Sequence, residues 1–145
     1  MFKTIAAITC LFLLSLTPAL AAGEVHRLAL QVSDNDPEKM NAALNVAANV
    51  SKHYAAKGDE VEIQIVAFNA GLHMLREDTS PVKERLVSFA GGMPNVSFKA
   101  CGNTLEGMEK KEGKKPTVVK NAEIVPAGVV TLMELSKKNW TIIRP

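Results

Sequence analysis

The sequence predicts an α/β fold: a single domain in which a parallel sheet is sandwiched between helices on both faces. Short β-prone runs alternate along the chain with segments whose apolar residues recur at helical spacing. Such alternation is typical of βαβ units, and it therefore indicates a doubly wound parallel sheet. The run 61–68 also becomes continuously apolar toward its end, which is the pattern of a strand covered on both faces.

The first 21 residues are predicted to be a secretory signal peptide. Met1-Phe2-Lys3 gives a basic start, an apolar run follows, and Ala19-Leu20-Ala21 supplies the small residues of a cleavage site, with cleavage after Ala22 as the neighbouring alternative. The apolar run falls short of the roughly 20 residues that span a membrane, so an uncleaved anchor is the weaker alternative. We therefore expect a domain over residues 22–145 that is periplasmic or secreted and has no membrane attachment after cleavage.

The first half of the domain contains a clear strand–helix–strand unit. Residues 26–32 alternate apolar and polar side chains and predict a strand. Asp36 is a natural N-cap and Pro37 fits the first helical turn, so a helix is expected from there. Gly58 is placed to end that helix in a left-handed conformation. The run 61–68 is the second strand.

The second half continues the alternation. A short helix is expected over 72–75, where Leu72, Met74 and Leu75 are apolar, and Ser80-Pro81 is expected to start another helix, which the segment 91–94 breaks. The third strand is 95–100, and a helix is expected from about Asn103. The remaining predicted elements are the β-prone pieces 117–119 and 123–125, a helix opened by Pro126-Ala127-Gly128 and stopped at Asn139, and a final strand over 140–144.

Cys101 is the main candidate for chemistry. It is the one cysteine outside the predicted signal peptide, whereas exported proteins usually carry cysteines in disulfide pairs. It follows a strand and precedes a helix, and a helix N-terminus lowers the pKa of a thiol. The ligand crevice of a doubly wound sheet lies beyond the carboxyl ends of the strands, so we expect the loops 69–71 and 101–103 to meet there, with 33–35 as a third contributor. A buried core thiol remains the alternative at equal weight.

Several other function classes find little support. A formal net charge of +2, or +1 once Lys3 is removed, does not indicate nucleic-acid binding. No glycine-rich phosphate loop follows a strand, no Cys-x-x-Cys pair exists, and the three histidines are widely separated. We therefore expect no metal and no cofactor. A Cys101–His73 hydrolytic dyad is a third hypothesis, since His73 follows one of the loops at the same edge of the sheet.

Three segments together resemble the DsrE/DsrF-like family, most closely its secreted branch with a single cysteine. They are Phe68-Asn69-Ala70-Gly71-Leu72, the stretch 96–104 that contains Cys101, and Val125-Pro126-Ala127-Gly128-Val129-Val130, followed by a terminal Trp-x-Ile-Ile strand. The resemblance extends from about His26 to Pro145. It implies a compact sandwich with a parallel sheet and flavodoxin-like layering.

The resemblance also implies a function. The better-understood family members act in sulfur relay and sulfur oxidation, where a cysteine at the position resembled by Cys101 carries sulfur as a persulfide and passes it to a partner protein. Carried over, Cys101 is the sulfur acceptor, Asn69 and Gly71 line the neighbouring wall, and Gly102 and Asn103 belong to the same site. The resemblance implies a homo-oligomer, whether dimer, trimer or hexamer, and a sulfur-transfer partner. A non-catalytic module that binds a small ligand or assembles with other chains, with Cys101 as a structural residue, is the alternative.

Overall fold

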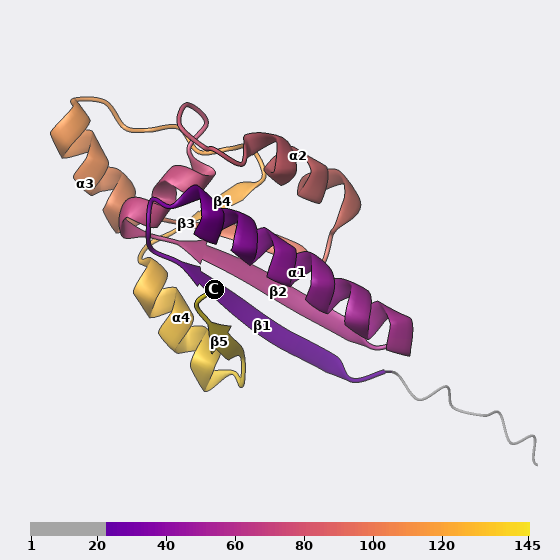
Figure 1. Ribbon diagram of the computed structural model, residues 1–145. Coiled ribbons are helices and arrows are strands. Elements are labelled where there is room, and N and C mark those ends of the chain that lie inside the picture. The colour runs from indigo at the N-terminus through magenta and orange to yellow at the C-terminus, as the bar shows by residue number, and fades with distance from the viewer. Residues whose placement is uncertain (1–22) are drawn as a thin grey trace, which may run out of the picture.

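The computed structural model describes residues 23–145 and contains a five-stranded, wholly parallel sheet of order β4-β3-β2-β1-β5 (Figure 1). The predicted α/β fold is confirmed. The predicted signal peptide, residues 1–21, lies outside the described residues. The strands are β1 Val25–Val32, β2 Glu60–Ala67, β3 Val96–Cys101, β4 Ala122–Val125 and β5 Thr141–Ile143.

Helices cover both faces of this sheet. The helices α1, α2 and α3 and the short 3-10 helix η1 contribute to one face, and α4 packs on the other (Figure 1). None of the helices within residues 23–145 is long and apolar enough to cross a membrane. The helices are α1 Pro37–Lys57, η1 Asn69–Leu75, α2 Lys83–Gly92, α3 Gly102–Glu112 and α4 Gly128–Lys137.

The larger core lies between the sheet and the face covered by α1. Strand alternation sends one set of side chains to this face, and the register Leu30↔Ile65 and Ile65↔Phe98 aligns them across the three central strands. Leu44 of α1 and Leu86 of α2 are fully buried against this set. Burial of such side chains stabilises the fold by about 1.5–3 kcal/mol each, so this face holds the domain together.

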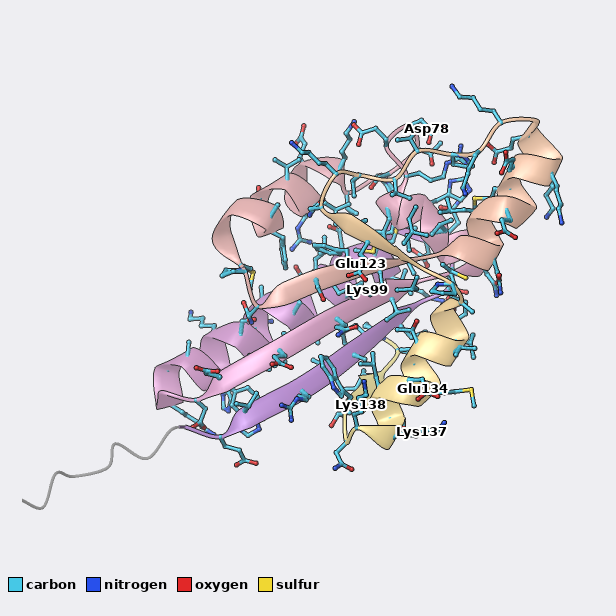
Figure 2. The ribbon with its side chains drawn as sticks, turned by 180° about the vertical axis from the view of Figure 1, so that it is seen from behind. Asp78, Lys99, Glu123, Glu134, Lys137 and Lys138 are labelled. Carbon is cyan, nitrogen blue, oxygen red and sulfur yellow. The ribbon has the colours of Figure 1, made fainter. Side chains whose placement is uncertain are left out.

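The opposite face has a smaller core and a polar region. Ala29, Val66 and Phe68 pack there with Cys101 beneath Leu132 and Leu135 of α4. In Figure 2, which shows the molecule from behind, the labelled Lys99 and Glu123 lie on this face beside α4 and form an ion pair between β3 and β4. α4 therefore covers only part of this face.

The helix boundaries predicted at Asp36, Gly58 and Asn139 are confirmed. The Asp36 carboxylate accepts hydrogen bonds from the backbone N–H groups of Glu38 (2.9 Å) and Lys39 (3.4 Å), as an N-cap does. Gly58 ends α1 with φ 77°, and Asn139 adopts φ 62° after α4. Both are left-handed conformations that glycine and asparagine tolerate best.

Besides η1, which begins at Asn69 rather than at Leu72, two helix starts differ from the prediction. α2 begins at Lys83 rather than at Ser80-Pro81, because the Ser80 hydroxyl forms a turn by donating to the Met74 carbonyl and accepting from the Val82 N–H. α3 begins at Gly102, so that Cys101 itself occupies the N-cap position. The second difference matters for the site, since it places the sulfur directly at a helix N-terminus.

Candidate functional site

A cavity of about 790 Å³ lies at the carboxyl ends of β2 and β3, and Cys101 is one of its lining residues. α3 leaves β3 toward one face of the sheet, whereas α4 leaves the neighbouring strand β4 toward the other. Such divergence opens a crevice in doubly wound sheets, as expected from the sequence. The lining residues are Phe68, Asn69, Ala70, His73, Cys101, Asn103, Thr104, Gly107, Met108, Lys111, Glu112, Ala127, Gly128, Val129 and Val130.

Cys101 is the only cysteine among residues 23–145, and it is a free thiol with 5 % of its surface exposed. Burial alone raises the pKa of this thiol. The Thr104 hydroxyl and the N–H groups of Gly128, Thr104 and Asn103 act in the opposite direction and together hold the pKa of Cys101 below its ordinary value. The sulfur accepts no capping hydrogen bond from the backbone of α3, so the N–H groups act on the thiolate as nearby dipoles.

Two helix N-termini supply these donors. Thr104 lies in the first turn of α3, and Gly128 is the first residue of α4. The Asn103 N–H, which donates to the Pro126 carbonyl oxygen at 3.1 Å, contributes least of these donors to the lowered pKa of Cys101. Unpaired N–H groups and the positive ends of two helix dipoles favour an anion at the sulfur.

Thr104 is held in place by the loop that follows β2. The backbone N–H of Asn69 donates to the Thr104 hydroxyl oxygen at 3.0 Å. Asn69 adopts φ 50°, a left-handed conformation that is uncommon outside glycine and turns the chain sharply at the start of η1. With its oxygen occupied as an acceptor, the Thr104 hydroxyl is free to donate its proton toward Cys101.

The proposed site residues fall into two groups. Asn69 and Asn103 line the cavity with Cys101. Gly71 and Gly102 do not: a Cβ at Gly71 would lie 2.3 Å from the Val32 carbonyl oxygen, and one at Gly102 would lie 3.0 Å from the Val125 carbonyl oxygen. Both glycines therefore permit close backbone packing beside the site.

The loop 33–35, a third expected contributor, lies elsewhere. The Asp34 carboxylate pairs with Lys39 (2.7 Å) and Arg144 (2.7 Å), and the loop is absent from the lining of the cavity. Cys101 ends β3, and β2 lies between β3 and β1 in the sheet. The loop after β1 is therefore one strand farther from Cys101 than the loop after β2.

His73 shares the cavity with Cys101 but has a partner of its own. Its Nδ1 lies 2.8 Å from the Thr79 hydroxyl oxygen. The strongest influences on the pKa of Cys101 come from burial, Thr104 and backbone N–H groups rather than from an imidazole. Among residues 23–145, no cluster of three or more potential metal-ligating side chains is present.

Gly128 is a site residue that was predicted as part of a helix start but not as part of the site. A Cβ there would lie 3.0 Å from the Phe68 Cβ, so the glycine lets α4 approach the end of β2 closely. Thr104 is a second site residue that was not among the predicted ones. The available signal was its position three residues after Cys101, which places it in the turn whose N–H groups face the sulfur.

The fold has a counterpart among solved structures. A protein of unknown function from Methanobacterium thermoautotrophicum, MTH1491, is similar to this chain with a TM-score of 0.67 and 24% sequence identity. The match covers 83% of this chain and 99% of that chain. No protein-family model matches the chain, and no curated protein is significantly similar to it. The likeness to MTH1491 bears on the fold alone.

Proposed function

We propose that this chain is an exported DsrE/DsrF-like protein that carries sulfur as a persulfide on Cys101. The observation that carries the proposal is the convergence of two helix N-termini and the Thr104 hydroxyl on a single thiol at the edge of a cavity. These donors favour a thiolate, which is the nucleophilic form of cysteine. They also favour a persulfide anion, because it carries a negative charge close to the same helix N-termini.

The proposed step needs no cofactor. The Cys101 thiolate attacks the outer sulfur of a donor persulfide, R–S–SH. A new S–S bond forms to Cys101, the bond between the two donor sulfurs breaks, and its electron pair leaves with the thiolate R–S⁻. The product is Cys101–S–SH, and an acceptor thiolate removes the outer sulfur by the same reaction in reverse. The outer sulfur is transferred without any net oxidation or reduction.

Intact-mass spectrometry tests the proposal. The chain should carry Cys10→Ser, so that Cys101 is its one cysteine whether or not the N-terminal segment is removed. Incubation with glutathione persulfide should add the mass of one sulfur atom, and a reduced acceptor thiol should remove it. The matched Cys101→Ser variant should gain no mass. A folded chain with Cys101 that never gains sulfur contradicts the proposal.

A binding or assembly module with a structural Cys101 is the second candidate. The small exposed fraction of the Cys101 side chain favours it, since free cysteines are among the most buried residues. This candidate predicts that Cys101 becomes modifiable only when the protein unfolds. It also predicts that Cys101→Ser preserves the oligomeric state, whereas a marked change in that state would argue against it.

The proposal includes self-association and export. α4 exposes three apolar side chains, Val129, Val130 and Met133, each more than half accessible. The sheet face beside α4 is incompletely covered, although parallel sheets are usually buried on both faces. A homo-oligomer that buries this surface accounts for both features. A sulfur-transfer partner protein would then bind to the assembled oligomer.

Export is tested by N-terminal sequencing. The sequence of the protein recovered from a secretion-competent host should begin at Ala22 or Gly23, and an intact Met1 would contradict export.

A further inference from the structure

The cavity continues from Cys101 along one face of α3. Thr104, Gly107, Met108 and Lys111 line it at spacings of three and four residues, which places them on the same side of the helix. Cys101 and Lys111 are ten residues apart, or about 15 Å along the helix axis at 1.5 Å per residue. The cavity is therefore longer than a single thiol group requires.

Gly107 lies in the middle of this lining and has no packing role. A Cβ built there meets no atom within 4 Å. Glycine in a helix interior costs about 1 kcal/mol relative to alanine, so its presence opposes helix stability. Its one structural effect here is to leave space over α3, between the sulfur and Lys111.

Lys111 provides a cation at the far end of the cavity. Its ammonium forms no ion pair among the residues that the structure describes. The adjacent Glu112 carboxylate is already engaged, because Arg76 donates to its two oxygens at 2.6 and 2.9 Å. Lys111 is therefore available to an anionic group on a ligand.

We infer that this cavity binds a peptide-like thiol or persulfide about three residues long, with its sulfur at Cys101 and an anionic end at Lys111. The inference rests on the proposed function of Cys101. Three extended residues span about 10 Å, and the lysine side chain bridges the remainder. The cavity volume of about 790 Å³ is within the range typical of small-molecule sites.

The burial of Cys101 favours a slender ligand. With 5 % of its surface exposed, the sulfur is out of reach for a flat protein surface. A free peptide thiol and a flexible cysteine-bearing chain end share the required chemistry. Comparison of glutathione with a cysteine-terminated peptide as competitors for Cys101 distinguishes these two sources.

The rate of thiol–disulfide exchange at Cys101 measures the preference of the cavity for a long, anionic ligand, and it does so without requiring sulfur transfer. The Cys101 thiolate attacks one sulfur of a symmetrical disulfide, the disulfide bond breaks, a mixed disulfide forms, and the other half leaves as a thiolate. Oxidised glutathione is the long, anionic probe, and bis(2-hydroxyethyl) disulfide is the short, neutral one. Rates are followed by intact mass on the Cys10→Ser chain.

Gly107→Leu tests the length of the site. It should slow the reaction with oxidised glutathione by about tenfold and leave the reaction with the short disulfide within about twofold. Gly91→Leu is the matched control, because a Cβ at Gly91 in α2 also meets no atom within 4 Å but lies outside the cavity. An unchanged ratio of the two rates in a folded Gly107→Leu variant overturns the inference.

Lys111→Gln tests the contact between Lys111 and the anionic end of the ligand. It also tests the inference independently if Gly107→Leu fails to fold. It should slow the reaction with oxidised glutathione by about threefold at low salt, with no change for the neutral disulfide. Lys110→Gln is the control, because Lys110 is absent from the lining. Equal effects of the two lysine variants overturn the inference. A Cys101 that reacts with neither disulfide until the protein unfolds contradicts the proposed function itself.

Discussion

The backbone N–H of Asn69 donates a hydrogen bond to the Thr104 hydroxyl oxygen across 3.0 Å. The two residues are 35 positions apart in the sequence and belong to different connections of the sheet. The contact fixes the direction of the Thr104 hydroxyl, which is the strongest of the groups that lower the pKa of Cys101. A loop after β2 thereby holds the residue that most lowers the pKa of a cysteine at the end of β3.

Removal of the Thr104 hydroxyl should destabilise the thiolate form of Cys101. Thr104→Val keeps the shape of the side chain but cannot donate a hydrogen bond, so the alkylation rate of Cys101 at neutral pH should fall by about tenfold, the value of a hydrogen bond to a charged group. Thr104→Ser restores the hydroxyl and should restore most of the rate. Equal rates in the valine and serine variants, measured by iodoacetamide labelling, would contradict this role.

Gly71 and Gly107 should respond in opposite ways to alanine. A Cβ at Gly71 would lie 2.3 Å from the Val32 carbonyl oxygen, so Gly71→Ala should lower the free energy of unfolding by about 3 kcal/mol through overpacking. Gly107→Ala meets open space and should raise it by about 0.5–1 kcal/mol through helix propensity. Urea denaturation measures both changes, and a tolerated Gly71→Ala would disprove the proposed close packing of η1 against β1.

The fold should lose stability in acid through Asp78. Arg76, 4 % exposed, donates to the Asp78 carboxylate at 2.9 and 2.7 Å, and this bond outweighs desolvation to lower the pKa of Asp78 from 3.8 to about 2. A carboxylate with a lowered folded pKa contributes stability that is fully present above its unfolded pKa and is lost as the pH falls through the folded value. The free energy of unfolding should therefore decline from about pH 4 to about pH 2.

Asp78→Asn should flatten this part of the pH profile. Glu84→Gln is the control, because Glu84 forms no ion pair among residues 23–145. Thermal unfolding across this pH range measures the slopes. Identical slopes in the wild type and Asp78→Asn would exclude this linkage.

Self-association should depend on α4. Met133 is 56 % exposed on this helix, and Met133→Glu places a charge within the proposed interface, so association should weaken by at least about tenfold. Val87 on α2 is an apolar residue with 66 % exposure, and Val87→Glu is therefore the matched control. Sedimentation equilibrium distinguishes them: a monomeric wild type, or equal weakening by both variants, would reject this interface.

Local sequence signals predicted much of the fold because their causes are local. Asp36, Gly58 and Asn139 act through the backbone of their own or adjacent turns, and each is found in the predicted conformation. The alternation of strands and helices likewise predicted a parallel sheet, because few chain paths connect such elements. Cys101 and Asn69 were predicted at one edge of this sheet, and both line the cavity.

The remaining features depend on distances that no local pattern encodes. Gly128 lies beside Phe68 because α4 crosses the sheet after β4, and the sequence alone does not give that contact. Gly71 was predicted to line the site, yet its lack of a side chain serves packing against β1. A glycine that permits close packing and a glycine that leaves open space look the same in a sequence.

The most direct test of the central claim is the pH dependence of Cys101 alkylation in the folded chain carrying Cys10→Ser. The convergence of two helix N-termini and Thr104 on the sulfur predicts a midpoint below the free-cysteine value of about 8.5, although burial acts in the opposite direction. A thiol that titrates at or above that value, or that reacts only after unfolding, would contradict an activated Cys101 and favour the structural alternative.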